Sequence, residues 1–191
     1  MTPTKASNIF SSYLGAYNRI KEINPLDYCY SALNIRLMPL PKDHPEYQII
    51  RQYIQNGSHG YHEGFIQNIF ALERKGETQR IKQWQHLNNN MLLWHGSRAS
   101  NFMGILNQGL RIAPPEAPAT GYMFGKGVYF ADSFQKSFGY CGDTAYDEEN
   151  KKSYALMLLC EVALGPMYEL TQAQYITELP CKSSFFFIAV S

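Results

Sequence analysis

The stretch spanning residues 94–141 carries the residue types that a ligand site needs. It sets histidine, serine, arginine and tyrosines among glycines, reading Trp-His-Gly-Ser at 94–97, Gly-Tyr-Met-Phe-Gly-Lys-Gly-Val-Tyr-Phe-Ala-Asp at 121–132 and Lys-Ser-Phe-Gly-Tyr-Cys at 136–141. Aromatic rings offer a flat surface at low entropy cost, glycines let a backbone approach closely, and hydroxyls fix orientation. The run therefore favours a ligand that is both stacked and hydrogen-bonded, although each residue alone also suits an ordinary turn or a core position.

The length and charge of the chain set bounds on its class. At 191 residues it suits one domain, which would bury roughly 68–70% of its unfolded surface. It has 17 basic and 16 acidic residues, a net charge of +1, and no basic stripe or arm. We therefore expect no direct nucleic-acid binding from this segment.

The cysteines and the first residues indicate an intracellular protein. The four cysteines form no Cys-x-x-Cys pair and have no histidine at ligand spacing; they are Cys29, Cys141, Cys160 and Cys181. Free thiols in a reducing compartment are therefore expected, with neither a zinc site nor a disulfide framework. The chain begins Met-Thr-Pro-Thr-Lys-Ala-Ser, without the apolar run of a signal peptide, and no segment approaches a membrane span. We expect no membrane attachment and no metal.

The first elements ahead of the site alternate between strand and helix. Residues 33–37 show the period of a strand, which prolines then end. Residues 43–57 predict a helix with Asp43 as N-cap and Gly57 at its end. Residues 66–74 are again strand-like.

The next elements lead into the site. Thr78 is expected to cap a short helix, and residues 91–95 show a short buried-strand pattern. Ser100 is then expected to cap a helix that ends at Gly109. Gly104 inside that helix costs about 1 kcal/mol against alanine, which suggests close approach of backbone or ligand.

The last elements complete an α+β pattern. Residues 127–131 predict a strand, Asp132 is expected to cap the following helix, and residues 154–164 predict a long apolar strand. Single strands alternate with short helices without a regular crossover repeat, which indicates an α+β fold.

The motifs at residues 73–76 and 92–132 resemble the catalytic domain of the poly(ADP-ribose) polymerase family, and the similarity runs over about residues 24–180. This family belongs to the ADP-ribosyltransferases whose site contains a histidine, a tyrosine and a glutamate. The resemblance implies the ADP-ribosyltransferase fold of the diphtheria-toxin type, a mostly antiparallel split sheet with short helices. It also implies an NAD-dependent transferase that cleaves the nicotinamide–ribose bond and passes ADP-ribose to protein side chains, with NAD as substrate, a nuclear location and a role in DNA repair.

The resemblance assigns a role to each residue that matches the motif. His95 and Tyr129 match catalytic positions. The residues implied in NAD binding are His95, Gly96, Ser97, Gly104, Arg111, Tyr122, Ser137 and Tyr140, and those implied on the acceptor side are Met123 and Lys136. Within this set, the Gly96 backbone and the Ser137 hydroxyl would hold the nicotinamide carboxamide. Tyr140 would stack on the ring, Tyr129 would line the opposite side, and His95 would bond the adenosine ribose.

The chain departs from the family at its two ends. Beyond residue 180 the family continues through further strands, one bearing the catalytic glutamate in a Tyr-x-Glu-Tyr setting, whereas this chain continues Cys-Lys-Ser-Ser-Phe-Phe-Phe-Ile-Ala-Val-Ser. We expect residues 23–180 to form a catalytic domain that lacks its last strands, followed by an unrelated apolar tail at 181–191. Residues 1–22 predict a helix that is either the remnant of a helical regulatory domain or simply packs on its own domain.

Two functions therefore stand. The first is an NAD-dependent protein ADP-ribosyltransferase. The second is a catalytically impaired NAD-binding variant or fragment that lacks the catalytic glutamate, because Glu161, Glu169 and Glu178 match ordinary strand and loop positions of the family.

Overall fold

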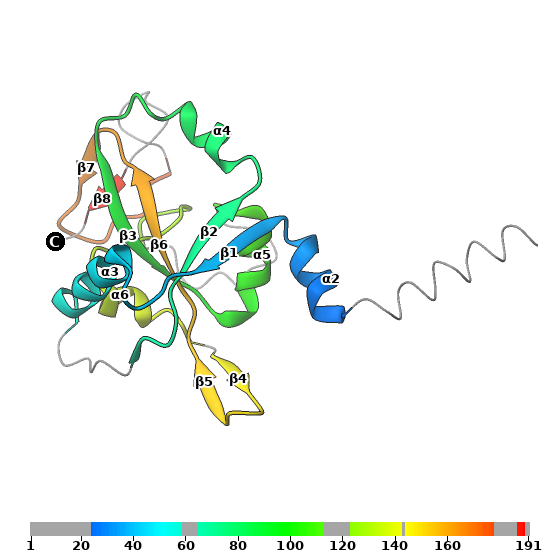
Figure 1. The fold of residues 1–191 in the computed structure, drawn as a ribbon. Helices are drawn as coiled ribbons and strands as arrows, with labels where there is room; N and C mark the ends of the chain where they lie inside the picture. The colour runs from blue at the N-terminus through cyan, green and yellow to red at the C-terminus, as the bar shows by residue number, and fades with distance from the viewer. Residues whose placement is uncertain (1–23, 59–64, 113–122, 143, 178–186, 190–191) are drawn as a thin grey trace, which may run out of the picture.

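A computed structural model of the chain describes residues 24–58, 65–112, 123–142, 144–177 and 187–189 (Figure 1). Helices and strands are mixed along these residues. The helices are α2 (Pro25–Ala32), α3 (Pro45–Asn56), α4 (Glu77–Lys82), α5 (Phe102–Gln108), which a 3₁₀ turn at Ala99–Asn101 precedes, and α6 (Phe134–Phe138). The strands are β1 (Ile35–Pro39), β2 (Phe70–Arg74), β3 (Asn90–Gly96), β4 (Ala145–Asp147), β5 (Lys152–Tyr154), β6 (Met157–Ala163), β7 (Met167–Glu169) and β8 (Phe187–Ala189).

The described strands form four pairs. Strands β1 and β2, β3 and β6, and β4 and β5 pair antiparallel, whereas β7 and β8 pair in parallel. The β4–β5 hairpin projects away from the rest of the chain (Figure 1). The expectation of an α+β fold with mostly antiparallel strands is therefore confirmed for the part of the chain that the structure describes.

The β3–β6 pair presents two faces with different neighbours. His95 lies opposite Leu158, and Trp94 lies opposite Leu159. Because paired residues of an antiparallel ladder share a face and successive residues alternate, His95 and Trp94 lie on opposite faces. Adjacent residues of one strand thus serve different purposes: Trp94 faces the core and His95 faces the opposite side.

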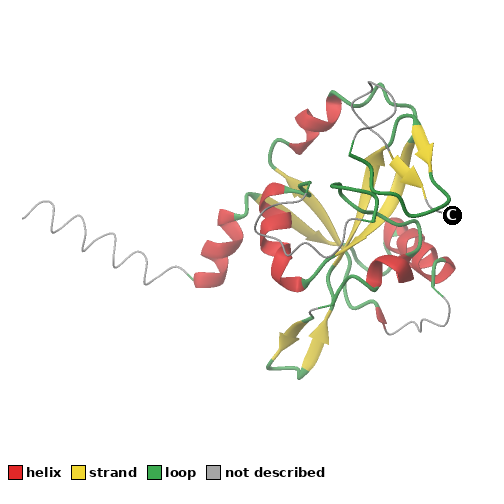
Figure 2. Cartoon of the chain, turned by 180° about the vertical axis from the view of Figure 1, so that it is seen from behind, coloured by secondary structure: helices red, strands yellow, loops and turns green. Residues whose placement is uncertain are grey.

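The core forms on the Trp94 face, under α3 and α6. Trp94, Ile54 and Phe134 are buried together. The Trp94 ring stacks on Tyr53 at 5.6 Å and meets Phe134 edge-on at 5.2 Å. The Tyr53 hydroxyl donates to the carbonyls of Leu92, at 2.9 Å, and Asp132, at 3.1 Å. Figure 2 shows α3 and α6 side by side, and this packing fixes α6 against β3.

Four predicted caps are wrong by one or two residues, for local reasons. At α3 the cap is His44, not Asp43, because Pro45 takes the first helical position and the His44 ring accepts from the Glu46 N–H at 3.3 Å. At α6 it is Ser133, not Asp132, and its hydroxyl accepts from the Lys136 N–H at 3.5 Å.

The other two expected caps lie inside helical turns. Thr78 falls within α4, which begins one residue earlier after Gly76 in the left-handed conformation. Ser100 falls within the 3₁₀ turn that precedes α5. The predicted stops at Gly57 and Gly109 are confirmed.

The predicted strand at residues 127–131 is also wrong. Only Ala131 pairs there, as an isolated bridge to Trp94. The long strand predicted at 154–164 is divided, since Tyr154 ends β5 and β6 begins at Met157. The predicted helix within residues 1–22 lies outside the described residues.

The apolar tail contributes one strand. Phe187–Ala189 pairs in parallel with Met167–Glu169, so an uncharged β-branched and aromatic run pairs with a strand that offers an edge. None of the described helices is both long enough and apolar enough to cross a membrane.

Two glycines near the site make a matched test of this packing. A Cβ at Gly96 would lie 1.8 Å from the Ser137 carbonyl oxygen, whereas a Cβ at Gly104 meets nothing within 4 Å. We expect Gly96→Ala to lower the free energy of unfolding by about 1–3 kcal/mol or more, because the β3 and α6 backbones must separate. We expect Gly104→Ala to raise it by about 0.5–1 kcal/mol, because alanine is the better helix former.

Urea denaturation of the two variants and the parent chain measures both effects. Equal stability of Gly96→Ala and the parent would contradict the close approach of α6 to β3.

Candidate functional site

An interrupted β-ladder lies at the centre of the site. The Trp94 N–H donates to the Ala131 carbonyl at 2.7 Å, and the Ala131 N–H donates to the Trp94 carbonyl at 2.9 Å. In an antiparallel ladder the next such pair would be Gly96 and Tyr129. The Tyr129 carbonyl instead bonds Nδ1 of His95 at 2.8 Å. The imidazole thus occupies the acceptor that Gly96 would otherwise use, and the ladder ends.

The interruption exposes one backbone donor and one backbone acceptor. Because Trp94 directs its N–H and C=O towards Ala131, Gly96 two residues on directs its own to the same edge, away from β6. Among the described residues neither group has a hydrogen-bond partner. The Gly96 edge can therefore pair with a planar amide as a strand residue would.

Ser137 brings a hydroxyl to the same place. Its side chain is 3% exposed, and Oγ donates to the Trp94 carbonyl at 2.9 Å. Helix α6 can lie this close because Gly96 has no Cβ, as the 1.8 Å separation from the Ser137 carbonyl shows. The packing of α6 against β3 therefore requires a glycine at position 96, whether or not a ligand also approaches it.

His95 is held as a neutral hydrogen-bond acceptor. Burial lowers the pKa of its imidazole, and the backbone hydrogen bond to Tyr129 opposes this only in part. Since the Tyr129 carbonyl can only accept, Nδ1 carries the proton and Nε2 presents a lone pair. The Phe130 ring meets the imidazole at 5.7 Å and an angle of 61°, which fixes its plane further.

The Tyr129 hydroxyl closes the loop that precedes it. It donates to the Gly125 carbonyl at 2.6 Å and accepts from the Phe124 N–H at 3.3 Å. Gly125 has a φ of 101° and approaches Ile176, whose carbonyl oxygen would lie 2.4 Å from a Cβ. The Tyr129 ring is thereby fixed at its hydroxyl end while 39% of the residue remains exposed.

The other residues that the resemblance assigns to the nicotinamide ring and to the acceptor side are exposed. Tyr140 follows α6, donates its N–H to the Ser137 carbonyl at 3.0 Å and is 64% exposed. Lys136 on α6 and Met123 in the loop before Tyr129 are exposed as well. These three side chains have the freedom to meet a ligand.

The residues that the family resemblance assigns to the adenosine half of NAD lie between the end of β3 and the segment just beyond α5. Ser97 Oγ accepts from the Asn101 side chain at 3.0 Å, which ties it to the 3₁₀ turn. Gly104 is exposed on α5, and a Cβ there would meet no atom of the described residues outside its own helix within 4 Å, so the described part of the chain gives no packing reason for this glycine. Arg111 is exposed just beyond α5. Tyr122 lies outside the described residues.

Sequence reasoning missed three residues that hold the site in place. Tyr53 joins α3 to β3 and to the turn before α6 through the two bonds described above. Gly125 fixes the loop before Tyr129. Arg74 contacts the carboxyl end of α5. The only sequence signal for Gly125 was its place in a Gly-Lys-Gly turn, and nothing in local periodicity pointed to the other two.

The described residues include no group of three histidine, cysteine, aspartate or glutamate side chains that could hold a metal ion. The described cysteines are free: Cys29 is exposed, Cys141 is buried and Cys160 is half-buried.

Comparison with known proteins decides the family. The sequence profile described as "Poly(ADP-ribose) polymerase catalytic domain" matches residues 44–187. The chain belongs to this family. It is 49% identical over 172 residues to poly [ADP-ribose] polymerase 1 of Gallus gallus, covering 88% of this chain and 16% of the relative. It is 52% identical over 155 residues to poly [ADP-ribose] polymerase 2 of Zea mays, covering 80% and 23%.

Membership confirms the family resemblance and carries the ADP-ribosyltransferase fold with it, in agreement with the mixed helices and mainly antiparallel strands. The chain spans only about a sixth to a quarter of the length of these relatives, at 16% and 23%.

The neutral His95 predicts a pH dependence of stability. Its pKa in the folded chain lies below the ordinary 6.5. As the pH falls through about 6.5, the unfolded chain therefore takes up a proton that the folded chain does not, and the free energy of unfolding decreases. His95→Asn removes the titrating group and keeps an N–H donor for the Tyr129 carbonyl. We expect urea denaturation at pH 7.5 and 5.5 to show a smaller pH-dependent loss in this variant, and an unchanged loss would contradict the assignment.

Proposed function

We propose that this chain is the NAD-binding part of an NAD-dependent protein ADP-ribosyltransferase of the poly(ADP-ribose) polymerase type. The reaction cleaves the bond between nicotinamide and ribose and transfers ADP-ribose to a protein side chain. The observation that carries the proposal is the Gly96 edge, where a backbone N–H and C=O without partners among the described residues lie beside the Ser137 hydroxyl.

The Gly96 edge matches the nicotinamide carboxamide. A primary amide has one C=O and one NH₂ in a plane, so it accepts from the Gly96 N–H and donates to the Gly96 C=O as a neighbouring strand would. The Ser137 hydroxyl adds a third polar group, and its burial keeps it in place. Hydrogen bonds made in such a water-poor place orient the ligand as well as hold it.

The two tyrosines supply the faces of the ring site. Tyr140 is exposed and free to stack on the nicotinamide, and Tyr129, fixed through its hydroxyl, lines the opposite side. Aromatic stacking of this kind contributes about 0.5–1.5 kcal/mol beyond the area buried. A ring fixed on one side and an exposed ring on the other would together hold the nicotinamide between them.

The His95 ring and the α5 region suit the adenosine half of NAD. The Nε2 lone pair of a neutral imidazole accepts from a ribose hydroxyl. Ser97, Gly104 and Arg111 follow along the chain, with open space at Gly104 and a guanidinium suited to the polar and phosphate groups of the nucleotide. The family motif also implies Tyr122 in NAD binding.

Cleavage of the nicotinamide–ribose bond depends mainly on how the protein positions the two parts of NAD. Departure of nicotinamide leaves a ribosyl oxocarbenium ion, so the protein must fix the leaving group and the ribose relative to each other and stabilise positive charge. His95 and Tyr129 are the catalytic residues of the described part, and they are joined directly by their hydrogen bond. Lys136 and Met123 lie on the exposed side where an acceptor protein would approach.

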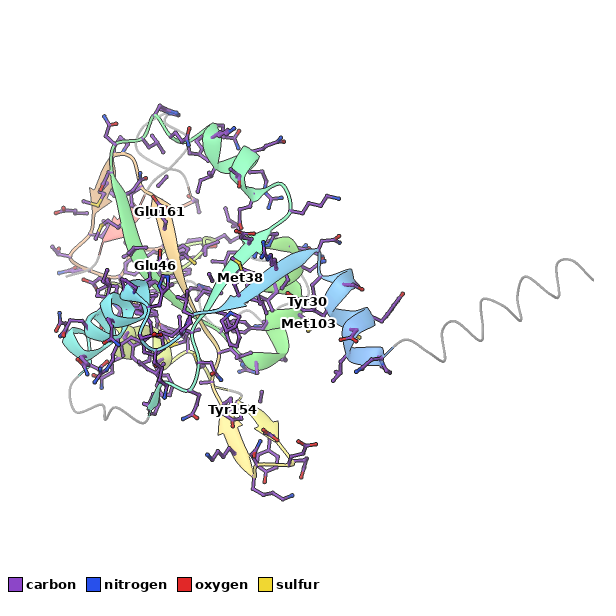
Figure 3. All side chains as sticks on the ribbon, viewed as in Figure 1. Tyr30, Met38, Glu46, Met103, Tyr154 and Glu161 are labelled. Carbon is purple, nitrogen blue, oxygen red and sulfur yellow. The ribbon has the colours of Figure 1, made fainter. Side chains whose placement is uncertain are left out.

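A second candidate function is NAD binding without transfer. Glu161 on β6 lies opposite Leu92, four positions along the ladder from the Gly96–Met157 pair, about 13 Å at the rise of a strand, and so lies away from the Gly96 edge. Figure 3 shows Glu161 in the half of β6 away from α6. Glu169 is exposed on β7, and Glu178 lies outside the described residues. None of the described glutamates after β5 therefore fills the role of the family's catalytic carboxylate.

The wider setting is also proposed from the family. We assign residues 23–180 to the transferase domain, residues 1–22 to an N-terminal helix and residues 181–191 to a separate apolar tail. A nuclear location and a role in DNA repair follow the family, and any attachment to nucleic acid or chromatin is assigned to other segments. NAD and acceptor protein side chains are the proposed partners.

Benzamide binding tests the nicotinamide half. We expect benzamide, which carries the same carboxamide, to bind the folded chain, and Tyr140→Ala to weaken the affinity by about tenfold through loss of stacking. Tyr146→Ala is the matched control, because Tyr146 is similarly exposed, at 54%, but lies on the projecting β4–β5 hairpin. Isothermal calorimetry measures all three proteins. Equal weakening in both variants, or no binding to a folded sample, would contradict the assignment.

Labelled NAD separates the two candidate functions. We expect the 191-residue chain to release nicotinamide slowly and to make no long polymer, because loss of one transition-state partner typically costs about 10²–10³ in rate. Gel electrophoresis with adenylate-labelled NAD and chromatography of free nicotinamide provide the measurement. Label on protein supports transfer, binding without nicotinamide release supports the second candidate, and long polymer would exclude the second candidate.

A further inference from the structure

The motif at residues 73–76 resembles the family closely, yet the resemblance assigns none of its residues to NAD or to the acceptor. Its arginine is unusual for a strand residue, because the Arg74 side chain is only 8% exposed. A buried guanidinium requires partners for its N–H groups. Among the described residues, the hydrogen-bond partners of the Arg74 side chain lie on α4 and α5, which are separate from its own strand β2.

Arg74 binds the carboxyl end of α5. Its Nε donates to the Leu106 carbonyl at 2.8 Å, and a terminal nitrogen donates to the Ile105 carbonyl at 3.0 Å. The last carbonyls of a helix carry partial negative charge, so a cation placed there is favourable. The Ile105 carbonyl also accepts from the Gly109 N–H at 2.8 Å, so Arg74 adds a second hydrogen bond to that carbonyl. Gly109, with φ of 81°, turns the chain away at this point towards Arg111.

Glu77 holds the guanidinium in place from the other side. Its carboxylate forms an ion pair with the terminal nitrogen of Arg74 that does not bind Ile105. Gly76, in the left-handed conformation, starts α4 at Glu77 and so directs this carboxylate back towards β2. The motif at 73–76 therefore builds a clamp of Arg74 and Glu77 on the end of α5.

The clamp also reaches the sheet that carries His95. Cys160 lies opposite Leu93, on the same face of the β3–β6 pair as His95. Burial raises the pKa of its thiol to about 11, with a further rise from Glu77 and an opposing effect of Arg74. The charges of Glu77 and Arg74 therefore act on the Cys160 thiol, on the face of the sheet that also carries His95.

We propose that Arg74 is a positioning residue for the adenosine half of the NAD site. It holds α5, and with it Gly104 and the turn that leads to Arg111, at a set distance from His95. The inference rests on the proposed NAD site. It differs from the roles assigned there, because Arg74 would act through α5 without touching the nucleotide.

The test compares two ligands in one variant. Arg74→Gln removes the charge and leaves donors for only part of the α5 carbonyls. We expect its affinity for ADP-ribose to fall by about tenfold, and its affinity for benzamide to stay within about twofold, since the Gly96 edge and Ser137 lie on β3 and α6. Arg36→Gln is the matched control, because Arg36 faces Glu73 across the β1–β2 pair at 4.0 Å with both side chains exposed, at 71% and 63%.

Amide hydrogen exchange adds a readout that needs no ligand. We expect faster exchange in a peptide covering residues 102–112 of Arg74→Gln, with unchanged exchange in a peptide covering β3. Equal affinities of Arg74→Gln and the parent for ADP-ribose would overturn the positioning role, and so would equal losses for both ligands. If the parent chain bound neither ligand, the proposed NAD site would fail, whereas unaltered exchange at 102–112 would refute the clamp itself.

Glu77→Gln keeps the inference testable if Arg74→Gln does not fold. This variant leaves the bonds of Arg74 to Leu106 and Ile105 in place and removes only the charge that orients the guanidinium. We expect the same selective loss for ADP-ribose at a smaller size, about threefold, and faster exchange at 102–112. Equal affinities and exchange would overturn the role of the pair.

Discussion

The hydrogen bond between the His95 imidazole and the Tyr129 carbonyl organises the site. It takes the acceptor that would continue the ladder from the Trp94–Ala131 bridge, so strand pairing stops at the place of the proposed ligand. The same bond leaves Nε2 of His95 as an acceptor and leaves the Gly96 backbone groups free of protein partners among the described residues. One contact between side chain and backbone therefore prepares two ligand-facing features. Replacing the imidazole would disturb both halves of the site together, which sets His95 apart from residues that serve one half alone.

This bond can persist because the strand beneath it is rigid. Trp94 is buried against α3 and α6, and Tyr53 ties α3 to the strand through a hydroxyl whose pKa is raised by burial and further by Asp132. The absence of a Cβ at Gly96 lets α6 approach, which brings the Ser137 hydroxyl beside the strand end. The core on one face of β3 and the polar site at its end are thus parts of one packing arrangement.

The two halves of the proposed NAD site are supported in different ways. The nicotinamide half is built on β3 and α6 and depends on apolar packing around Trp94. The adenosine half extends along α5, whose end is held by the charged groups of Arg74 and Glu77. A charged clamp requires good geometry because both groups are partly desolvated, so it fixes orientation more than it contributes net stability. This difference is why substitutions in the clamp and in the core should affect the two ligand halves differently.

The family, the α+β class and the elements with a strong local signal could be predicted from the sequence. Examples are the helix that stops at Gly57 and the strand predicted at residues 91–95, which the structure extends by one residue at each end to Asn90–Gly96. Periodicity and capping depend on residues close together in the sequence, so they can be predicted without knowledge of the tertiary structure. The tertiary structure alone decided that residues 127–131 form one bridge in place of a strand, because the Tyr129 carbonyl meets an imidazole 34 residues away in the sequence. It alone placed Arg74 on α5, 31 and 32 residues further along. Such pairings depend on which donors the fold brings within reach of an acceptor, and no local pattern records that.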